Sequence, residues 1–187
     1  MLWSTTFKLG KYTFLLKAQS MKKLDVRSEG VSSRIPGTSL HAISLDYDNI
    51  TDDRLVEELI HIQDEKRIGN FYVLETRNEG RHAICIDALP FKDAKAVVDY
   101  SSCDLMFKRG PRINEYRCWV LRFAPKGNRP APKYLYKIKS PYEGAHLQSR
   151  AHAKYLMKFG IEKIDLKKPF GPEEIETQEY NTGKRTE

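Results

Sequence analysis

The sequence HAISLDYD at residues 41–48 marks the start of the expected core. A short apolar run ends there in two acids, Asp46 and Asp48, which predicts a strand that stops at the acids. Residues 51–53 (TDD) then predict a helix N-cap with acids in the first turn. Apolar side chains recur at helical spacing from there to about Arg67, so we expect a strand followed by a helix.

The following residues predict the remaining elements of one mixed domain. In order, these are a strand at 71–76, a turn at 78–80, a strand at 81–87, a helix from Pro90, a strand at 105–107, a loop at 108–115, a strand at 116–123 and a helix at about 143–159. The order strand, helix, strand, strand, helix, strand is typical of an RRM-like or ferredoxin-like unit. We therefore expect an α+β core of that kind with an extra C-terminal helix.

The two ends of the chain are predicted to lie outside this core. Residues 1–19 alternate loosely between apolar and polar and favour a hairpin around Gly10 and Lys11, and residues 28–39 are expected to form a loop. The predicted division is an N-terminal extension at 1–40, a core domain at 41–160 and a flexible tail at 161–187.

Composition narrows the class of protein. The chain has 187 residues, 40% hydrophobic and 30% charged, which suits one soluble globular domain. Its three cysteines are far apart without a C-x-x-C pair, so we expect no zinc site and a reducing, cytoplasmic location. No apolar run approaches about 20 residues, so we expect no membrane partner.

Charge is distributed unevenly around a formal net of +7. Residues 41–100 hold 7 basic and 13 acidic residues, whereas residues 105–140 hold 10 basic residues and one acidic residue. An acidic segment beside a basic one suits a site where carboxylates hold cations and Arg and Lys hold phosphates.

Three short patterns carry the candidate chemistry. Asp46 and Asp48, two apart on an extended strand, would point the same way about 7 Å apart and offer oxygen ligands to divalent cations. His82, after Gly80, could donate to a phosphate, and Asp104 at the start of the next strand could join the two acids. Each pattern has a plain alternative: helix-capping acids, an exposed histidine at a strand edge, and a turn residue capping the preceding helix.

In this order the three patterns resemble the archaeo-eukaryotic primase superfamily, whose motifs read hydrophobic-D-x-D/E, small-x-His and hydrophobic-D/E. The resemblance covers about residues 42–126. It implies that three carboxylates bind two Mg²⁺ or Mn²⁺ ions, that a histidine contacts phosphate, and that an Arg and a Lys contact the triphosphate or template. The matching residues are Asp46, Asp48 and Asp104 for the metal, His82 with the adjacent Arg81 for the nucleotide, and Arg122 and Lys126.

The resemblance implies template-dependent nucleotidyl transfer, as in a DNA primase or DNA polymerase of a plasmid, virus or archaeal-type replicon. The expected partners are a single-stranded or primed template, an NTP or dNTP, and a helicase or other replication protein. Two departures stand out: Cys103 precedes Asp104 in place of an aliphatic residue, and the zinc cluster of many cellular primases is absent from the sequence.

Two basic stretches are candidate template contacts. One is the predicted loop with Lys108, Arg109 and Arg112, followed by Arg117, and the other alternates Lys133 and Lys137 with tyrosines, on which bases could stack. A solvated charged run and an ordinary amphipathic edge strand explain them equally well.

Two further functions remain open at the sequence level. One is a non-catalytic nucleic-acid-binding module in replication initiation, favoured by the basic segment. The other is a simple RRM-like RNA binder, which is less favoured because residues 81–87 carry no aromatic side chain.

Overall fold

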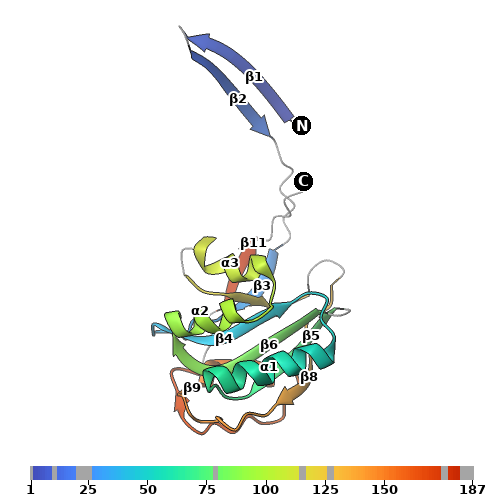
Figure 1. Ribbon diagram of the computed structural model, residues 1–187, viewed down its shortest axis with the longest axis vertical. Coiled ribbons are helices and arrows are strands. Elements are labelled where there is room, and N and C mark those ends of the chain that lie inside the picture. The colour runs from blue at the N-terminus through green and yellow to red at the C-terminus, as the bar shows by residue number, and fades with distance from the viewer. Residues whose placement is uncertain are drawn as a thin grey trace.

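The computed structural model describes residues 2–9, 12–19, 27–77, 80–113, 117–125, 129–173 and 177–181, and these form an α+β structure (Figure 1). The helices are α1 (Asp52–Lys66), α2 (Phe91–Tyr100), α3 (Leu105–Ile113) and α4 (Arg150–Met157). The strands are β1 (Leu2–Leu9), β2 (Tyr12–Gln19), β3 (Arg27–Ser32), β4 (Leu40–Tyr47), β5 (Phe71–Arg77), β6 (Gly80–Pro90), β7 (Val120–Arg122), β8 (Lys133–Ile138), β9 (Gln148–Ser149), β10 (Pro169–Phe170) and β11 (Thr177–Asn181).

A mixed six-stranded sheet is the centre of the fold. Strand β6 pairs antiparallel with β4 on one side and β5 on the other, and β8 pairs with β5 at the edge. Beyond the first residue of β5, Phe71, β9 pairs with β6 at Asp87, and β10 runs parallel to β9. The register places Asp46, His82, Leu74 and Tyr134 in one row across β4, β6, β5 and β8.

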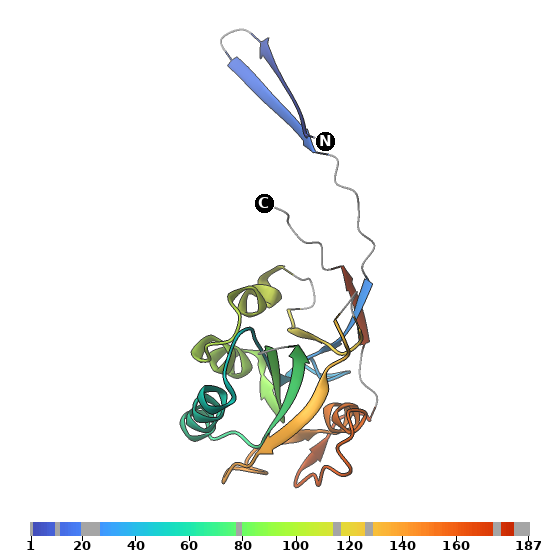
Figure 2. The same ribbon diagram turned by 90° about the vertical axis from the view of Figure 1, so that its right-hand side faces the viewer.

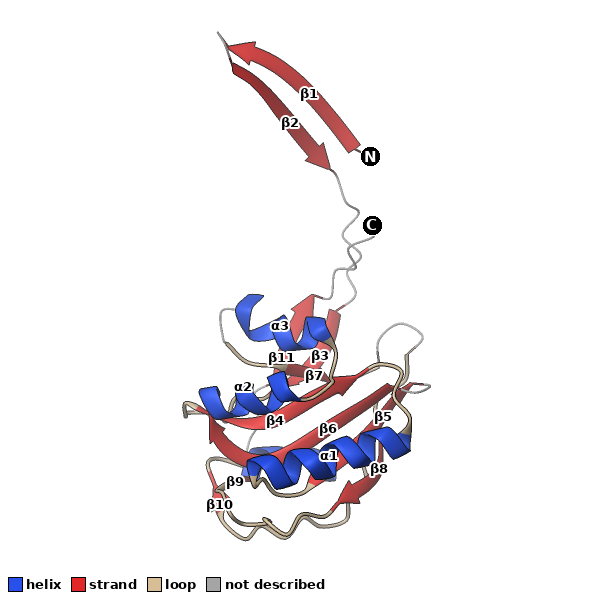
Figure 3. Cartoon of the chain, viewed as in Figure 1, coloured by secondary structure: helices blue, strands red, loops and turns tan. Residues whose placement is uncertain are grey.

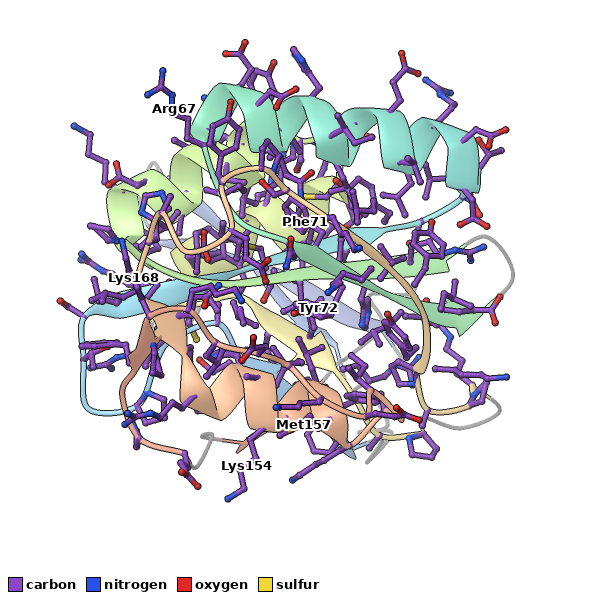
Figure 4. The ribbon with its side chains drawn as sticks, turned by 90° about the horizontal axis from the view of Figure 1, so that it is seen from below. Arg67, Phe71, Tyr72, Lys154, Met157 and Lys168 are labelled. Carbon is purple, nitrogen blue, oxygen red and sulfur yellow. The ribbon has the colours of Figure 1, made fainter. Side chains whose placement is uncertain are left out.

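Helices cover both faces of this sheet (Figure 2). Because side chains alternate along a strand, Phe71 and Tyr72 point to opposite faces (Figure 4). Phe71 packs in a core with α1 and α2, whereas Tyr72 packs in a second core with Ala153, Tyr155 and Leu156. The face under α4 is therefore distinct from the face under α1 and α2.

Residues 28–39 were predicted to form a loop, but the first of them belong to strand β3 of a small second sheet. Strand β3 pairs antiparallel with β7 and with β11, and the Ser33 amide donates to the Trp119 carbonyl at 2.8 Å. The Ala42 amide donates to the Ser33 carbonyl at 2.8 Å, so this segment connects β7 to β4. The prediction failed because a Ser- and Gly-rich stretch has weak local strand preference and is held here by its neighbours.

The predictions of a strand at 105–107 and a loop at 108–115 were wrong, because helix α3 begins at Leu105 and continues to Ile113. Leu105–Phe107 form the first turn of α3, which continues to Ile113. A short apolar run does not distinguish a strand from a helix segment. The N-terminus is set by Asp104, whose Oδ1 accepts from the Phe107 amide at 2.8 Å.

Most of the other predicted elements are confirmed. The hairpin of β1 and β2, the strands β4, β5 and β6 and the helices α1 and α2 lie where they were expected. The hairpin lies apart from the main sheet (Figure 3), and its turn at Gly10 and Lys11 lies outside the described residues. The strand expected at 116–123 is reduced to β7, and the helix expected at 143–159 begins only at Arg150.

The C-terminal segment expected to be a flexible tail contributes β10 and β11 to the two sheets. Within the described residues, no helix has the length and apolar character needed to cross a membrane.

Candidate functional site

Asp46 and His82 form the centre of the candidate site. They lie directly opposite each other on β4 and β6, with His82 Nε2 3.5 Å from Asp46 Oδ1. Their neighbours Leu45, Tyr47 and Ala83 pack under α1 and α2, so Asp46 and His82 face the α4 side of the sheet. The two motifs that were separate in sequence thus meet on adjacent strands.

His82 is held as a neutral imidazole. Burial lowers its pKa to about 3, and the nearby Arg122 charge lowers it further in the same direction. Because a carboxylate only accepts, the ring proton belongs on the nitrogen that faces Asp46, which leaves Nδ1 as an acceptor. Within the described residues, Nδ1 is buried without a hydrogen-bond partner, so this side chain has unused hydrogen-bonding capacity.

Arg122 approaches the same place from β7. Its guanidinium Nη1 donates to the carbonyls of Ala124 at 2.6 Å and Pro130 at 2.8 Å. These bonds hold a buried cation beside His82, as the pKa of the histidine reflects. Lys126, the other residue matched to a phosphate contact, lies outside the described residues.

Asp104 lies beside Asp46 through the main chain. Its amide donates to the Asp46 carbonyl at 2.8 Å, and its carboxylate caps α3. The structure therefore brings the third acidic motif to the first, although from a helix N-terminus and not from a strand. The alternative from sequence was that Asp104 caps the preceding helix. In the structure it caps the following helix, α3.

Asp48 lies beyond the end of β4 on the α1 side. It is exposed, and Asn49 beside it has φ 58°, so the extended geometry that would align Asp48 with Asp46 ends at Tyr47. Asp48 lines a groove of about 810 Å³ that Asp46 does not line. Other groove residues are Arg54, Glu57, Glu58, His61 and Asp64 of α1.

A divalent ion needs oxygen ligands that lie close together, so the spacing of the acidic side chains decides whether they could hold one. Within the described ranges, no three His, Cys, Asp or Glu side chains come close enough together to hold a metal. Mg²⁺ commonly uses only one or two carboxylates together with substrate phosphates, so a neighbouring pair of aspartates still suits it. Asp46 and Asp104 are neighbours through the main chain, where the Asp104 amide donates to the Asp46 carbonyl, and the two-ion site stays a prediction.

Arg81 lies on the opposite face from His82. Its Nε and Nη2 donate to the two carboxylate oxygens of Asp52, at 2.9 and 3.3 Å, which lowers the pKa of Asp52. Tyr136 donates to the same carboxylate at 3.0 Å. The structure thus gives Arg81 a role in holding the start of α1 against β6 and β8, away from the Asp46 side.

The predicted template contacts are scattered. Lys108 donates to the Asp99 carbonyl at 3.1 Å and also to the Ser101 carbonyl, at the end of α2. The remaining described ones are exposed: Arg109 on α3, Arg117 before β7, and Lys133 and Lys137 on the edge strand β8. Arg112 lies in α3, but its side chain is outside the described part.

Two charged features of the molecular surface were not predicted from the sequence. One is the acidic groove along α1, and the other is the basic outer face of α4, where Arg150, Lys154 and Lys158 recur every four residues. That spacing is readable from sequence and could have indicated a charged helix face.

Comparison with protein-family models finds no matching family, and comparisons with curated proteins and with solved structures find no significant match.

Proposed function

We propose that this chain is a template-dependent nucleotidyltransferase of the primase-polymerase type. The observation that carries the proposal is the convergence of three separate segments: Asp46 opposite His82, and Asp104 bonded through its amide to Asp46. Arg122 from β7 adds a buried positive charge beside them. A carboxylate beside a histidine, with an arginine and a second acidic residue close by along the main chain, suits the binding of a nucleoside triphosphate.

The arrangement of elements supports the same proposal. The order β4, α1, β5, β6, α2, with β6 between β4 and β5 and both helices on one face, is shared with the first five elements of a ferredoxin-like or RRM-like unit, whereas α3 follows in place of the sixth element, a strand. Such a unit supports many functions, so the fold alone does not determine the chemistry. The site residues therefore carry the argument.

Each side chain has a distinct part in the proposed reaction. Asp46 and Asp104 would hold a divalent ion, which lowers the pKa of a 3′-hydroxyl and stabilises the leaving pyrophosphate. Arg122 would offset the charge that builds up on the phosphates. His82, oriented by Asp46, would contact a phosphate, whose negative charge would raise the pKa of the imidazole and favour its protonated form.

Labelled-nucleotide incorporation tests this proposal. The wild-type chain is given single-stranded and primed templates with NTPs or dNTPs and with Mg²⁺ or Mn²⁺. We expect metal-dependent extension that Asp46→Ala/Asp48→Ala abolishes, whereas Glu65→Ala/Asp93→Ala, which removes two exposed acids that line neither the site nor the groove, leaves it intact. Extension that survives in the Asp46/Asp48 variant would contradict the proposal.

A second candidate is a non-catalytic nucleic-acid-binding module for replication initiation. It is favoured by the Asp104 carboxylate, which is engaged in capping α3. In this case the chain would bind template with a steep salt dependence, regardless of Mg²⁺ or Mn²⁺, and incorporate nothing.

A further inference from the structure

Helix α4 presents a stripe of basic side chains away from the sheet. Arg150, Lys154 and Lys158 lie four residues apart and are exposed, while Tyr155 and Leu156 are buried against the sheet. At 1.5 Å rise per residue, the three cations follow one another along about 12 Å of helix surface. Figure 4 shows Lys154 and Met157 on the outer side of α4.

The segment after the helix is also basic, although Lys168 lies beside the sheet and not on the outer side of α4 (Figure 4). Lys163, Lys167 and Lys168 are exposed, so residues 150–168 hold six basic and two acidic residues, a net of +4. We call Arg150, Lys154 and Lys158 the α4 basic surface. Helix α1, on the opposite face of the sheet, holds six acidic and two basic residues, a net of −4.

The two faces therefore differ in sign, and a polyanion approaching the molecule is attracted to α4 and repelled by α1. The acids near the α4 basic surface do little to neutralise it. Lys154 pairs with Glu173 at 3.4 Å and Lys167 with Asp165 at 3.0 Å, and all four side chains are at least half exposed. Exposed pairs of this kind contribute little and are screened by salt. Cations four apart on a helix repel each other, so an anionic partner would relieve that repulsion.

We propose that the α4 basic surface binds the sugar-phosphate backbone of a single-stranded nucleic acid. Asp46 and His82 face the same side of the sheet as α4, so a strand held there lies on the side of the candidate site. The choice of a template strand as the ligand rests on the proposed function. Exposed Met157 and half-buried Phe159 offer nearby apolar contact for bases, in addition to the phosphate contacts.

A lipid surface fits this face less well. A helix that lies in a membrane interface buries an apolar face in the lipid, and the apolar face of α4 is already occupied by the sheet. The described outer face offers only Met157 as a large exposed apolar side chain on α4.

The test measures binding of a labelled 20-nucleotide oligothymidylate by fluorescence anisotropy at several salt concentrations. The variant is Arg150→Gln/Lys154→Gln/Lys158→Gln, and the control is Lys66→Gln/Lys92→Gln/Lys95→Gln, which removes the same charge from α1 and α2. Circular dichroism melting checks that both variants are folded.

We expect the α4 variant to bind at least about tenfold more weakly at low salt, with the slope of log K against log salt reduced by roughly 2, since each lost phosphate contact contributes about 0.7. The control should bind like the wild type. Equal affinity and slope for the α4 variant and the wild type would overturn the proposal. Wild-type binding to phosphatidylserine vesicles but not to the oligonucleotide would also overturn it.

Measuring incorporation on the same samples separates this inference from the proposed function. If the wild type binds through α4 but incorporates no nucleotide, the α4 basic surface is supported and the nucleotidyltransferase proposal is contradicted. If the α4 variant incorporates nucleotides with an unchanged KM for template, the nucleotidyltransferase proposal is supported and the α4 basic surface is contradicted.

Discussion

At the scale of single residues, Asp104 has one observed role, in capping α3, and one proposed role, in metal binding. Its amide donates to Asp46, and its carboxylate accepts from the Phe107 amide at the start of α3. One side chain is thus proposed both to cap a helix and to hold a divalent ion. Substitutions that separate charge from hydrogen bonding can distinguish these contributions.

We predict that Asp104→Ala lowers the free energy of unfolding by about 1 kcal/mol, because an alanine cannot cap α3. Asp104→Asn should stay within a few tenths of the wild type, since asparagine is an equally good N-cap residue. Urea denaturation followed by circular dichroism measures both values. Equal destabilisation by the two substitutions would show that the cap contributes nothing.

Arg81 allows a second prediction at this scale. Its two hydrogen bonds to Asp52 use the planar guanidinium fork, which a lysine does not offer. Arg81→Lys should therefore destabilise the fold by about 1 kcal/mol, while oligonucleotide affinity stays unchanged. A large loss of oligonucleotide affinity with unchanged stability would instead place Arg81 at the nucleic-acid-binding surface. Urea denaturation and anisotropy on the same preparation provide the two readouts.

At the scale of elements, the sequence predicted the helices and strands whose local pattern of apolar residues is clear. Strand β4, helix α1 and helix α2 have clear periodicity and were predicted correctly. Residues 105–107 were assigned the wrong element because three apolar residues suit either a strand or a helical turn. Strand β3 was missed because its pairing partners, β7 and β11, lie about 90 and 150 residues further along the chain.

The same distinction holds for the candidate site. The sequence order of the motifs predicted that Asp46, His82 and Asp104 belong together. The structure pairs Asp46 with His82 and bonds the Asp104 amide to the Asp46 carbonyl, and a shared role for the three side chains stays a prediction. The sequence did not show that Asp48 lines a groove with α1 or that Arg81 faces Asp52, because both depend on where β4 ends and on which face a side chain lies.

The connection between α1 and β5 carries a prediction at the element scale. Gly69 donates its amide to the buried Asp87 carboxylate at 2.7 Å, and a Cβ on Gly69 would lie 2.9 Å from Asp87 Oδ1. Gly69→Ala should therefore destabilise the fold by about 1–3 kcal/mol through overpacking. Gly110→Ala is the matched control, because its Cβ would meet nothing closer than 3.9 Å and alanine favours the helix. Chemical denaturation of the two variants tests this, and equal stabilities would contradict the described contact.

At the scale of the whole molecule, three buried histidines link the layers. His41 and Ser33, and His152 with Ser149 and the Ser32 carbonyl, hold the β3 segment against β4 and α4. Burial lowers the pKa of His41 and His152 to about 4, and that of His82 to about 3. All three are therefore neutral in the folded protein at neutral pH.

This predicts a fold that weakens in mild acid. Below pH 6.5 the unfolded chain takes up protons on these histidines and the folded chain does not, so stability is full above pH 6.5 and falls as the pH drops toward 4. Each histidine should cost roughly 2 kcal/mol between pH 6.5 and pH 5. Burial raises the pKa of Asp87, which opposes the loss in part. Urea denaturation at pH 7.5 and pH 5.0 measures the difference, and equal stability at both would contradict the buried neutral state.

The proposed nucleotidyl transfer depends on the acids Asp46 and Asp104, and Asp104→Asn tests that dependence. This substitution keeps the α3 cap and removes one negative charge beside Asp46. On primed template with Mn²⁺ and dNTPs, the account predicts wild-type stability and incorporation reduced by about 100-fold or more, the loss typical when one group that stabilises the transition state is removed. Incorporation at the wild-type rate by folded Asp104→Asn protein would contradict the account.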